Sequence, residues 1–419
     1  RLVISYDMAT ATPASPYTLR TILRHRPFRV LWIAQFVSIF GDFLALFGVI
    51  LMITYKWHGT VLDVTTVTVA FVLPYTIVGP VAGVFVDHWN VKRVMIGSDL
   101  VRAVLIVGLV FVTDIRQVCV IFAVLSTVSS FFNPAQSVTL RTVVPMEGLM
   151  AANTMMAQAF YTVRIFSPAV AGLLVKWLGE KSCFYLDAVS FVFSAAMIST
   201  LVVQRPASTS EKTVKSLTQD FVAGNKFIFT HATLAFVFTA MAVAMFVLSS
   251  FSPLISIYIR DSLGARELAF GIISALVGVG LIVGTQLVNL LVRKFSKARV
   301  VLGGLVILGA GAALLGVFHN IIMAGVGTFT IGFAISFVIV PAQTLSQQET
   351  PPAMMGRVSS SFMSLFSLAQ VLGLLLSGFL AHWLGMRPLF IACAAALVVI
   401  AVLGQLKLRE TPAAPALSS

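Results

Sequence analysis

The chain has 419 residues, of which 58% are hydrophobic and 10% are charged, and its formal net charge is +13. Because a soluble domain has about 25% charged residues, this composition, with a mean hydropathy of +0.99, excludes a water-soluble globular protein, a coiled coil and a disordered chain. A spanning helix takes roughly 20 apolar residues and a crossing with its loop about 30–35, so the length predicts about twelve crossings.

Apolar runs between polar breaks predict six membrane helices on each side of one long polar stretch. The first six cover Phe28–Tyr55, Val67–Val86, Arg93–Thr113, Val118–Leu140, Leu149–Val175 and Ser182–Val203. The last six cover Ala232–Ile259, Leu268–Val292, Val300–Phe318, Ile321–Leu345, Ser359–Leu384 and Pro388–Leu406. The sequence therefore predicts an all-α membrane protein with twelve transmembrane helices in two six-helix pseudo-repeats. Its expected parts are an N-terminal segment (1–27), two bundles (28–203 and 232–408), a linker (204–231) and a tail (409–419).

The Lys and Arg residues of the loops predict which way the helices point. Of the 28, 19 lie on the side that holds both termini and the linker, seven lie in the opposite loops, and two lie inside helices. Cytoplasmic loops carry the excess of Lys and Arg, so both termini and the linker are expected in the cytoplasm. The basic charge then lies beside anionic lipid, and no nucleic-acid partner is expected.

The two halves repeat each other in sequence. Pro134-Ala135-Gln136-Ser137 recurs 207 residues later as Pro341-Ala342-Gln343-Thr344, and Pro145 and Pro352 keep the same offset. Arg93-Val94-Met95-Ile96-Gly97 recurs 206 residues later as Arg299-Val300-Val301-Leu302-Gly303. Two parallel six-helix repeats around a midplane site are typical of secondary transporters.

The segment from Gly83 to Arg93 resembles the signature loop of the major facilitator superfamily. Gly83, Asp87, Lys92 and Arg93 match it, whereas His88 and Asn90 stand where a basic residue and Gly are usual. The resemblance implies the major facilitator fold and a loop that latches the cytoplasmic face in the outward-open state.

Further stretches resemble the branch that holds enterobactin exporters and macrolide-efflux proteins. They are His25–Arg29, Asp99–Ala103, Thr162–Arg164, Asp187–Phe191 and Thr350–Arg357. The resemblance implies a monomer in a bacterial inner membrane that exports a drug or a siderophore. Ser167-Pro168 and Ala171-Gly172 replace the Gly-Pro and Gly-Gly pairs that exporters often carry.

Ionisable groups at membrane depth are costly, so each is a candidate functional group. Asp42 has no opposite charge within one turn and is predicted to be the proton-coupling carboxyl, with a fixed ion pair to a distant helix as the alternative. Asp99 and Arg102 stand three residues apart on one helix face and predict a local pair with a gating role. Arg164 is predicted to hold an anionic substrate group or to pair with Asp42. Asp187 is expected in helix packing or an outer gate.

Several uncharged residues are predicted to line a substrate cavity. They are Gln35, about two turns before Asp42, with Gln158, Tyr161, Met241 and Met245. Soft Met side chains re-pack around varied ligands. The alternative is that these residues bond or pack between helices.

No motif of an enzyme occurs in the sequence. It contains neither a Gly-x-x-x-x-Gly-Lys-Ser/Thr loop nor a His-Glu-x-x-His pair, and Cys119, Cys183 and Cys393 lie far apart. No cofactor or metal is therefore expected. The prediction is an alternating-access, proton-coupled exporter of amphipathic small molecules. A lysophospholipid flippase of the same superfamily and a transport-inactive receptor or scaffold on this fold are the alternatives.

Overall fold

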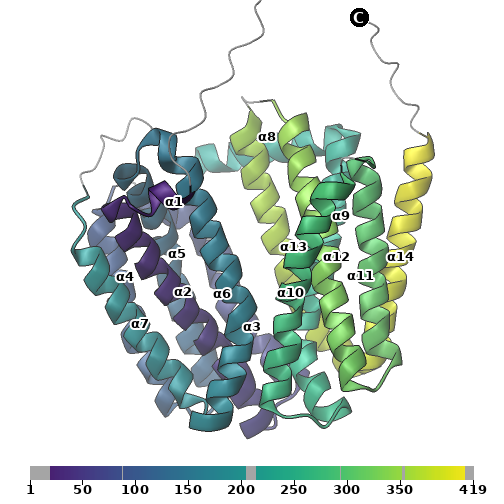
Figure 1. Cartoon of the computed structure of the whole chain (residues 1–419), viewed down its shortest axis with the longest axis horizontal. Coiled ribbons are helices and arrows are strands. Elements are labelled where there is room, and N and C mark those ends of the chain that lie inside the picture. The colour runs from purple at the N-terminus through teal and green to yellow at the C-terminus, as the bar shows by residue number, and fades with distance from the viewer. Residues whose placement is uncertain (1–18, 87, 204–213, 293, 352–353, 411–419) are drawn as a thin grey trace, which may run out of the picture.

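Long apolar helices form two bundles that stand side by side (Figure 1). The computed structural model describes residues 19–86, 88–203, 214–292, 294–351 and 354–410. The first bundle consists of α2 (Arg26–Leu51), α3 (Val61–Val86), α4 (Val91–Gly108), α5 (Ile115–Val143), α6 (Leu149–Leu178) and α7 (Lys181–Ser199). The second consists of α9 (Ala232–Ile257), α10 (Glu267–Leu291), α11 (Lys297–Val317), α12 (Ile321–Glu349), α13 (Met355–Leu384) and α14 (Met386–Glu410).

The predicted fold class is confirmed. Within the described residues, 12 helices are long and apolar enough to cross a membrane, and each overlaps one predicted span. The ends differ by a few residues. The largest difference is at α3, which begins at Val61 rather than at Val67 because Asp63 bonds Thr60 just before the helix.

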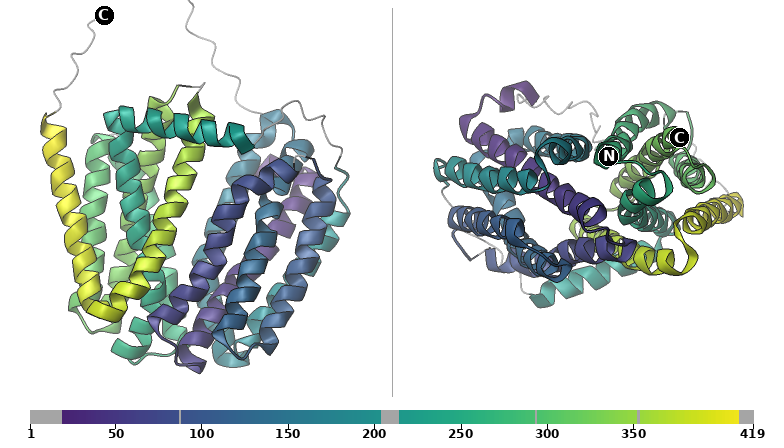
Figure 2. Two further views of the ribbon diagram at one scale, coloured as in Figure 1. Left: turned by 180° about the vertical axis from the view of Figure 1, so that it is seen from behind. Right: turned by 90° about the horizontal axis from the view of Figure 1, so that it is seen from below.

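The predicted linker contains a helix that the polar composition concealed. Helix α8 (Val214–Thr230) lies along the end of the molecule where the described chain begins and ends (Figure 2). It is fastened to α13, where Ser361 Oγ donates to the Phe221 carbonyl at 3.2 Å and the Arg357 backbone touches Gly224. A spacing of three and four is the signal for such a helix. It is present in the sequence at Val214, Leu217, Phe221, Gly224 and Ile228.

The first helix of each bundle ends in a π-helical turn. These turns, η1 (Met52–Lys56) and η4 (Tyr258–Ser262), lie 206 residues apart. Both make the same backbone bonds at 2.8–3.2 Å: Trp57 N to Met52 O and Gly59 N to Ile53 O, and Leu263 N to Tyr258 O and Ala265 N to Ile259 O. The internal repeat seen in the sequence therefore extends to individual hydrogen bonds.

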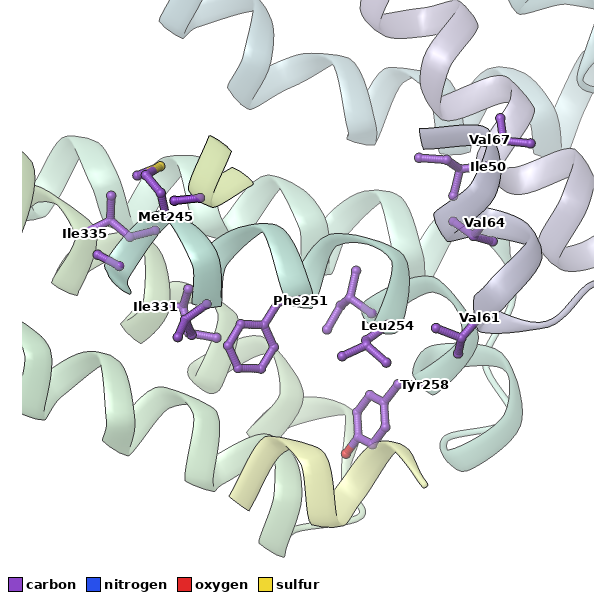
Figure 3. Packing of buried hydrophobic residues seen from close by; sticks show 14 of the residues in the cluster. Ile50, Val61, Val64, Val67, Met245, Phe251, Leu254, Tyr258, Ile331 and Ile335 are labelled. Atoms are coloured by element: carbon purple, nitrogen blue, oxygen red, sulfur yellow. The ribbon is translucent and has the colours of Figure 1, made fainter. Parts of the chain in front are cut away.

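The buried apolar residues join the bundles at one end only. One cluster contains Ile50 and Val64 of the first bundle together with Leu254 and Tyr258 of the second (Figure 3). A second cluster, around Phe28 and other residues near the opposite end, contains residues of the first bundle alone. We call the end with η1 and η4 the closed end and the end with α8 the open end.

Candidate functional site: a charged cluster and an exposed stripe of α6

Close helix contact holds the closed end together. A Cβ on Gly172 of α6 would lie 2.8 Å from the Glu267 carbonyl, and one on Gly271 of α10 would lie 2.7 Å from the Pro168 carbonyl. Glycine at both positions is what lets the backbones of α6 and α10 approach. Toward the middle of α6 the contact continues to Ile165, which touches Gly278.

Side chains also cross between the bundles at the closed end. Arg260 of η4 donates through Nη1 to the Gly59 carbonyl at 2.9 Å and to the Thr54 carbonyl. In the opposite direction, the Tyr55 hydroxyl donates to the Ala265 carbonyl at 3.2 Å. Gly59 and Ala265 occupy equivalent places in the repeat, so each bundle binds the same turn of the other.

Within the first bundle, Lys56 of η1 pairs with Glu180 between α6 and α7. Burial raises the pKa of Glu180, but the hydrogen bond from Lys56 and the charges of Lys56 and Lys181 outweigh it and hold the pKa below its ordinary value. This pair ties the loop between α6 and α7 to the closed end.

Toward the open end the two bundles separate. Ala157, Tyr161, Arg164 and Pro168 follow one another at four, three and four residues, so they share the face of α6 that meets α10. Pro168 is buried in that contact, whereas the three residues before it are exposed. Figure 2 shows α8 crossing the open end above the two bundles. The face of α6 that meets α10 is therefore covered near Pro168 and uncovered from Arg164 toward the open end.

Four ionisable side chains from α2, α4 and α7 gather inside the first bundle. Arg102 pairs with Asp99 one turn earlier, as predicted, and its Nη1 lies 3.7 Å from Asp42 Oδ2. Asp99 is fully buried and Arg102 nearly so, whereas a quarter of the Asp42 side chain is exposed. Asp42 is therefore the member of this ion pair network that solvent reaches.

Asp187 is brought to this network by a glycine. Gly41 has no side chain where Ser190 Oγ and Asp187 Oδ1 lie against it, so α7 packs directly on α2 beside Asp42. Asp187 is fully buried, and Ser190 Oγ lies 3.2 Å from its Oδ1. Asp187 therefore lies with these charged residues where α7 packs on α2, and its predicted role in helix packing or an outer gate stays a prediction. We call Asp42, Asp99, Arg102 and Asp187 the carboxyl cluster.

Two aromatic rings hold the arginine of the carboxyl cluster in place. The guanidinium carbon of Arg102 lies 4.5 Å from the ring centre of Phe132 on α5 and 4.2 Å from that of Phe191 on α7. Cation–π contacts of this kind are strongest where water is excluded. Among the described residues, Asp99 Oδ2, Asp187 Oδ2 and Arg102 Nε are buried without a hydrogen-bond partner.

The predicted substrate residues divide into two groups. Gln158, Tyr161 and Arg164 are exposed along α6 toward the open end. Gln35, Met241 and Met245 are buried, with 3%, 2% and 4% of their surface exposed. These three residues were predicted to line the substrate cavity, but in this conformation their side chains are buried because their helix faces pack against neighbouring helices.

The pairing of Arg164 with Asp42 is not seen either. Asp42 is taken by Arg102, and within the described chain no carboxylate lies at ion-pair distance from Arg164. An ion pair of Asp42 with a distant helix was the alternative prediction, and the structure shows one with Arg102. Its partner could not be named from the sequence, because a charge partner on another helix leaves no local spacing. Gly41, Ser190, Phe132 and Phe191 were missed for the same reason.

The signature loop is described in part. Gly83 lies near the end of α3, and Asn90 caps α4 by accepting a hydrogen bond from the Arg93 backbone at 3.1 Å. Lys92 and Arg93 are in the first turn of α4. Asp87 lies outside the described residues.

These features agree with comparisons to known proteins. The family model of the Major Facilitator Superfamily matches residues 31–370 and 237–419. The chain belongs to this superfamily. It is accordingly a multi-pass membrane transporter and not an enzyme.

Its relatives in this superfamily include efflux proteins. The transporter is 28% identical to the uncharacterized MFS-type transporter YfiS of Bacillus subtilis (strain 168), over 88% of this chain and 90% of that one. It is 23% identical to Macrolide efflux protein A of Streptococcus pyogenes, over 90% and 94% of the two chains. It is 25% identical to the Multidrug efflux pump Tap of Mycolicibacterium fortuitum, over 84% and 90%. The predicted resemblance to the macrolide-efflux branch is confirmed.

Solved structures agree on the fold. The nucleoside transporter NupG superposes with a TM-score of 0.74 at 14% identity, over 92% of this chain and all of that one. A bacterial homologue of the iron transporter ferroportin in an inward-facing state superposes with a TM-score of 0.70 at 14% identity, over 90% and 98%.

Proposed function

We propose that this transporter exports amphipathic small molecules from the cytoplasm by alternating access, in exchange for protons that Asp42 carries. The observation that supports it most directly is the carboxyl cluster, in which three carboxyl groups and one guanidinium gather inside a membrane-spanning bundle.

The charge balance of the carboxyl cluster favours proton binding. Like charges in a low-dielectric site oppose one another's ionisation, and one arginine offsets one carboxylate, so the cluster is most stable when it holds protons. Asp99 is fully buried and pairs with Arg102, while Asp42 is partly exposed. Asp42 is therefore the group best placed to exchange a proton with a water-filled cavity.

A proton on Asp42 changes the contacts between helices. Ionised Asp42 is attracted to Arg102 at 3.7 Å, and this attraction is lost when it is protonated. Because Arg102 is held between Phe132 and Phe191, it is α2 that responds to the change. The end of α2 is η1, which binds the second bundle at the closed end. Protonation of Asp42 is thus linked, through the continuous chain of α2 and η1, to the closed-end contacts that alternating access must break.

The direction of transport rests on the relatives and on the loop charges. The distribution of Lys and Arg favours a cytoplasmic open end, so the described conformation is the one that would accept a substrate from the cytoplasm. The macrolide and multidrug efflux proteins among the relatives favour export.

A lysophospholipid flippase is the second candidate function. Arg164 favours it, because this residue is exposed, has no carboxylate at ion-pair distance among the described residues, and follows the aromatic residues Phe160 and Tyr161 on α6. Such a surface suits an anionic head group and an acyl chain. In that case transport requires no proton movement through Asp42.

The test is substrate-induced proton flux in proteoliposomes with a trapped pH dye. The panel is a lipophilic cation, a macrolide, a catecholate siderophore and a lysophospholipid, applied to wild type, Asp42→Asn and, as a matched control, the exposed loop variant Asp114→Asn. Proton flux with one of the first three that persists in Asp114→Asn and is lost in Asp42→Asn supports the antiporter. Lysophospholipid movement that is equal in all three proteins, without proton flux, contradicts it and favours the flippase. Binding of none of the panel favours the transport-inactive receptor.

A further inference from the structure

Within the part of the chain that the structure describes, Arg164 is a permanent charge with no carboxylate at ion-pair distance. It lies near the middle of α6, on the helix face that meets α10, and its side chain is exposed. On the neighbouring helices, Asp42 of α2 is paired with Arg102, and Asp187 of α7 is buried against Ser190. The sequences of α5 and α6 contain no Asp or Glu.

The second bundle offers no counter-ion when the cavity closes. Between residues 268 and 348, which include nearly all of α10, α11 and α12, the sequence has no Asp or Glu, and none occurs between 350 and 409. Beyond the Ile165–Gly278 contact, the face of α10 that meets α6 continues with Thr285 and Asn289. These side chains are polar and uncharged, so they do not neutralise a guanidinium.

Alternating access requires that α6 and α10 close over this region in the other half of the cycle. Arg stays protonated in proteins, and burying it without a partner is strongly unfavourable. The charge must therefore be matched by a group that enters the cavity from outside the chain.

We propose that the transported molecule carries an anionic group, a carboxylate, phosphate or sulfonate, and that Arg164 binds it. This inference rests on the proposed function and specifies its substrate class as acidic amphipaths. Tyr161, one turn before Arg164 and 46% exposed, offers a hydroxyl to the same group. Phe160, whose ring meets Phe43 of α2, offers an apolar surface to the rest of the molecule. Closure around an empty cavity is then disfavoured by the unpaired charge, which couples the movement to the presence of substrate.

Binding to full-length protein in nanodiscs tests this proposal. Three fluorescent probes share an undecyl chain and a dansyl group and differ in the head: a carboxylate, its neutral amide and a trimethylammonium. Empty nanodiscs correct for partition into lipid. We expect the carboxylate to bind about ten-fold or more tightly than the amide, and Arg164→Gln to remove that difference while leaving the affinity of the amide unchanged.

Two further variants keep the outcome interpretable. Arg164→Lys retains the positive charge and is expected to retain the preference for the carboxylate. Asp42→Asn is expected to retain it as well, because Asp42 pairs with Arg102. Competition by lysophosphatidylglycerol would identify a lipid head group as the source of the anion, and its absence a soluble acid; both results support an anionic site.

The inference is overturned if a well-folded Arg164→Gln protein keeps the preference for the carboxylate, or if wild type prefers the trimethylammonium head. These results leave proton coupling through Asp42 standing, since that is measured by proton flux. Conversely, an intact anion preference together with unchanged proton flux in Asp42→Asn overturns the proposed coupling alone. Failure of all three probes to bind overturns the anionic site alone, and the proton-flux assay then decides the proposed coupling separately.

Discussion

The two bundles share a backbone plan but differ in the charges that they bury. In the first bundle, Asp99 and Arg102 lie inside α4. The positions 206 residues later, on α11, are Leu305 and Leu308, which are fully buried in an apolar core. The same helices therefore pack without charges in one half of the molecule. This difference agrees with the proposed role of the carboxyl cluster in transport, since the equivalent helices pack without charges and buried ion pairs contribute little net stability.

The largest expected effect comes from making the first bundle resemble the second. Arg102→Leu leaves three carboxyl groups without their cation, and breaking a buried pair costs about 3–5 kcal/mol, so its melting temperature in detergent should fall well below that of wild type. The double variant Asp99→Leu/Arg102→Leu should recover much of this loss but transport nothing. Wild-type proton flux in the double variant would contradict a role for the cluster.

The closed end is the part of the molecule where the two halves remain alike, so a substitution there sharpens the comparison. Arg260→Ala removes two hydrogen bonds from a charged donor, each worth about 1.5–3 kcal/mol. The state open at this end should rise in population by about ten-fold or more. Distances between spin labels at the exposed positions Leu62 and Arg266 measure this.

Tyr55, whose hydroxyl makes the symmetry-related bond to the Ala265 carbonyl, serves as the control for Arg260. Tyr55→Phe removes one neutral bond, worth about 1 kcal/mol, and should shift the distances in the same direction by less. Unchanged distances in Arg260→Ala would show that apolar packing alone keeps this end closed.

A third prediction concerns the glycine that brings α7 to Asp42. The position 206 residues after Gly41 is Val247, so the second bundle has a side chain where the first has none. Gly41→Ala places a methyl group against Ser190 and Asp187, and overpacking of this kind costs about 1–3 kcal/mol. Both the melting temperature and the proton flux should fall. Gly97→Ala on α4, where a Cβ meets open space, should change neither; equal effects of the two would contradict the close contact.

The smallest effect is expected at a pair that only the first bundle has. Lys56 binds Glu180, and the equivalent position to Lys56 is Ser262. Because the Glu180 pKa is held below its ordinary value of 4.5, the pair stabilises the protein at neutral pH and is lost as the pH falls through the lowered pKa. Glu180→Gln should therefore cost about 0.2–1 kcal/mol at pH 7. Melting curves should show that difference disappear in acid; a difference that persists there would contradict the ion pair.

The sequence predicted the fold well because hydropathy and loop charge are local signals. Twelve spans, the division into two halves and the repeat all follow from runs and spacings along the chain. The pair Asp99–Arg102 was predicted for the same reason, since its members lie on one turn. An ion pair of Asp42 with a distant helix was predicted only as an alternative, and its partner Arg102 could not be named, because that depends on how α2 packs against α4. The exposure of Arg164 and the burial of Met245 likewise depend on which helix faces meet. The sequence of a helix that is apolar on all sides indicates only weakly which face is buried.

The number of residues in the π-helical turns η1 and η4 determines which backbone groups meet at the closed end. A π-helical turn takes about one residue more than an α-helical turn for the same full rotation, so deleting one residue between Met52 and Lys56 would return the turn to α-helix and remove a residue from the segment that presents the Thr54 carbonyl to Arg260. One-residue deletions in η1 or η4 would therefore probe the backbone part of this contact, whereas substitution of Arg260 probes its side-chain part.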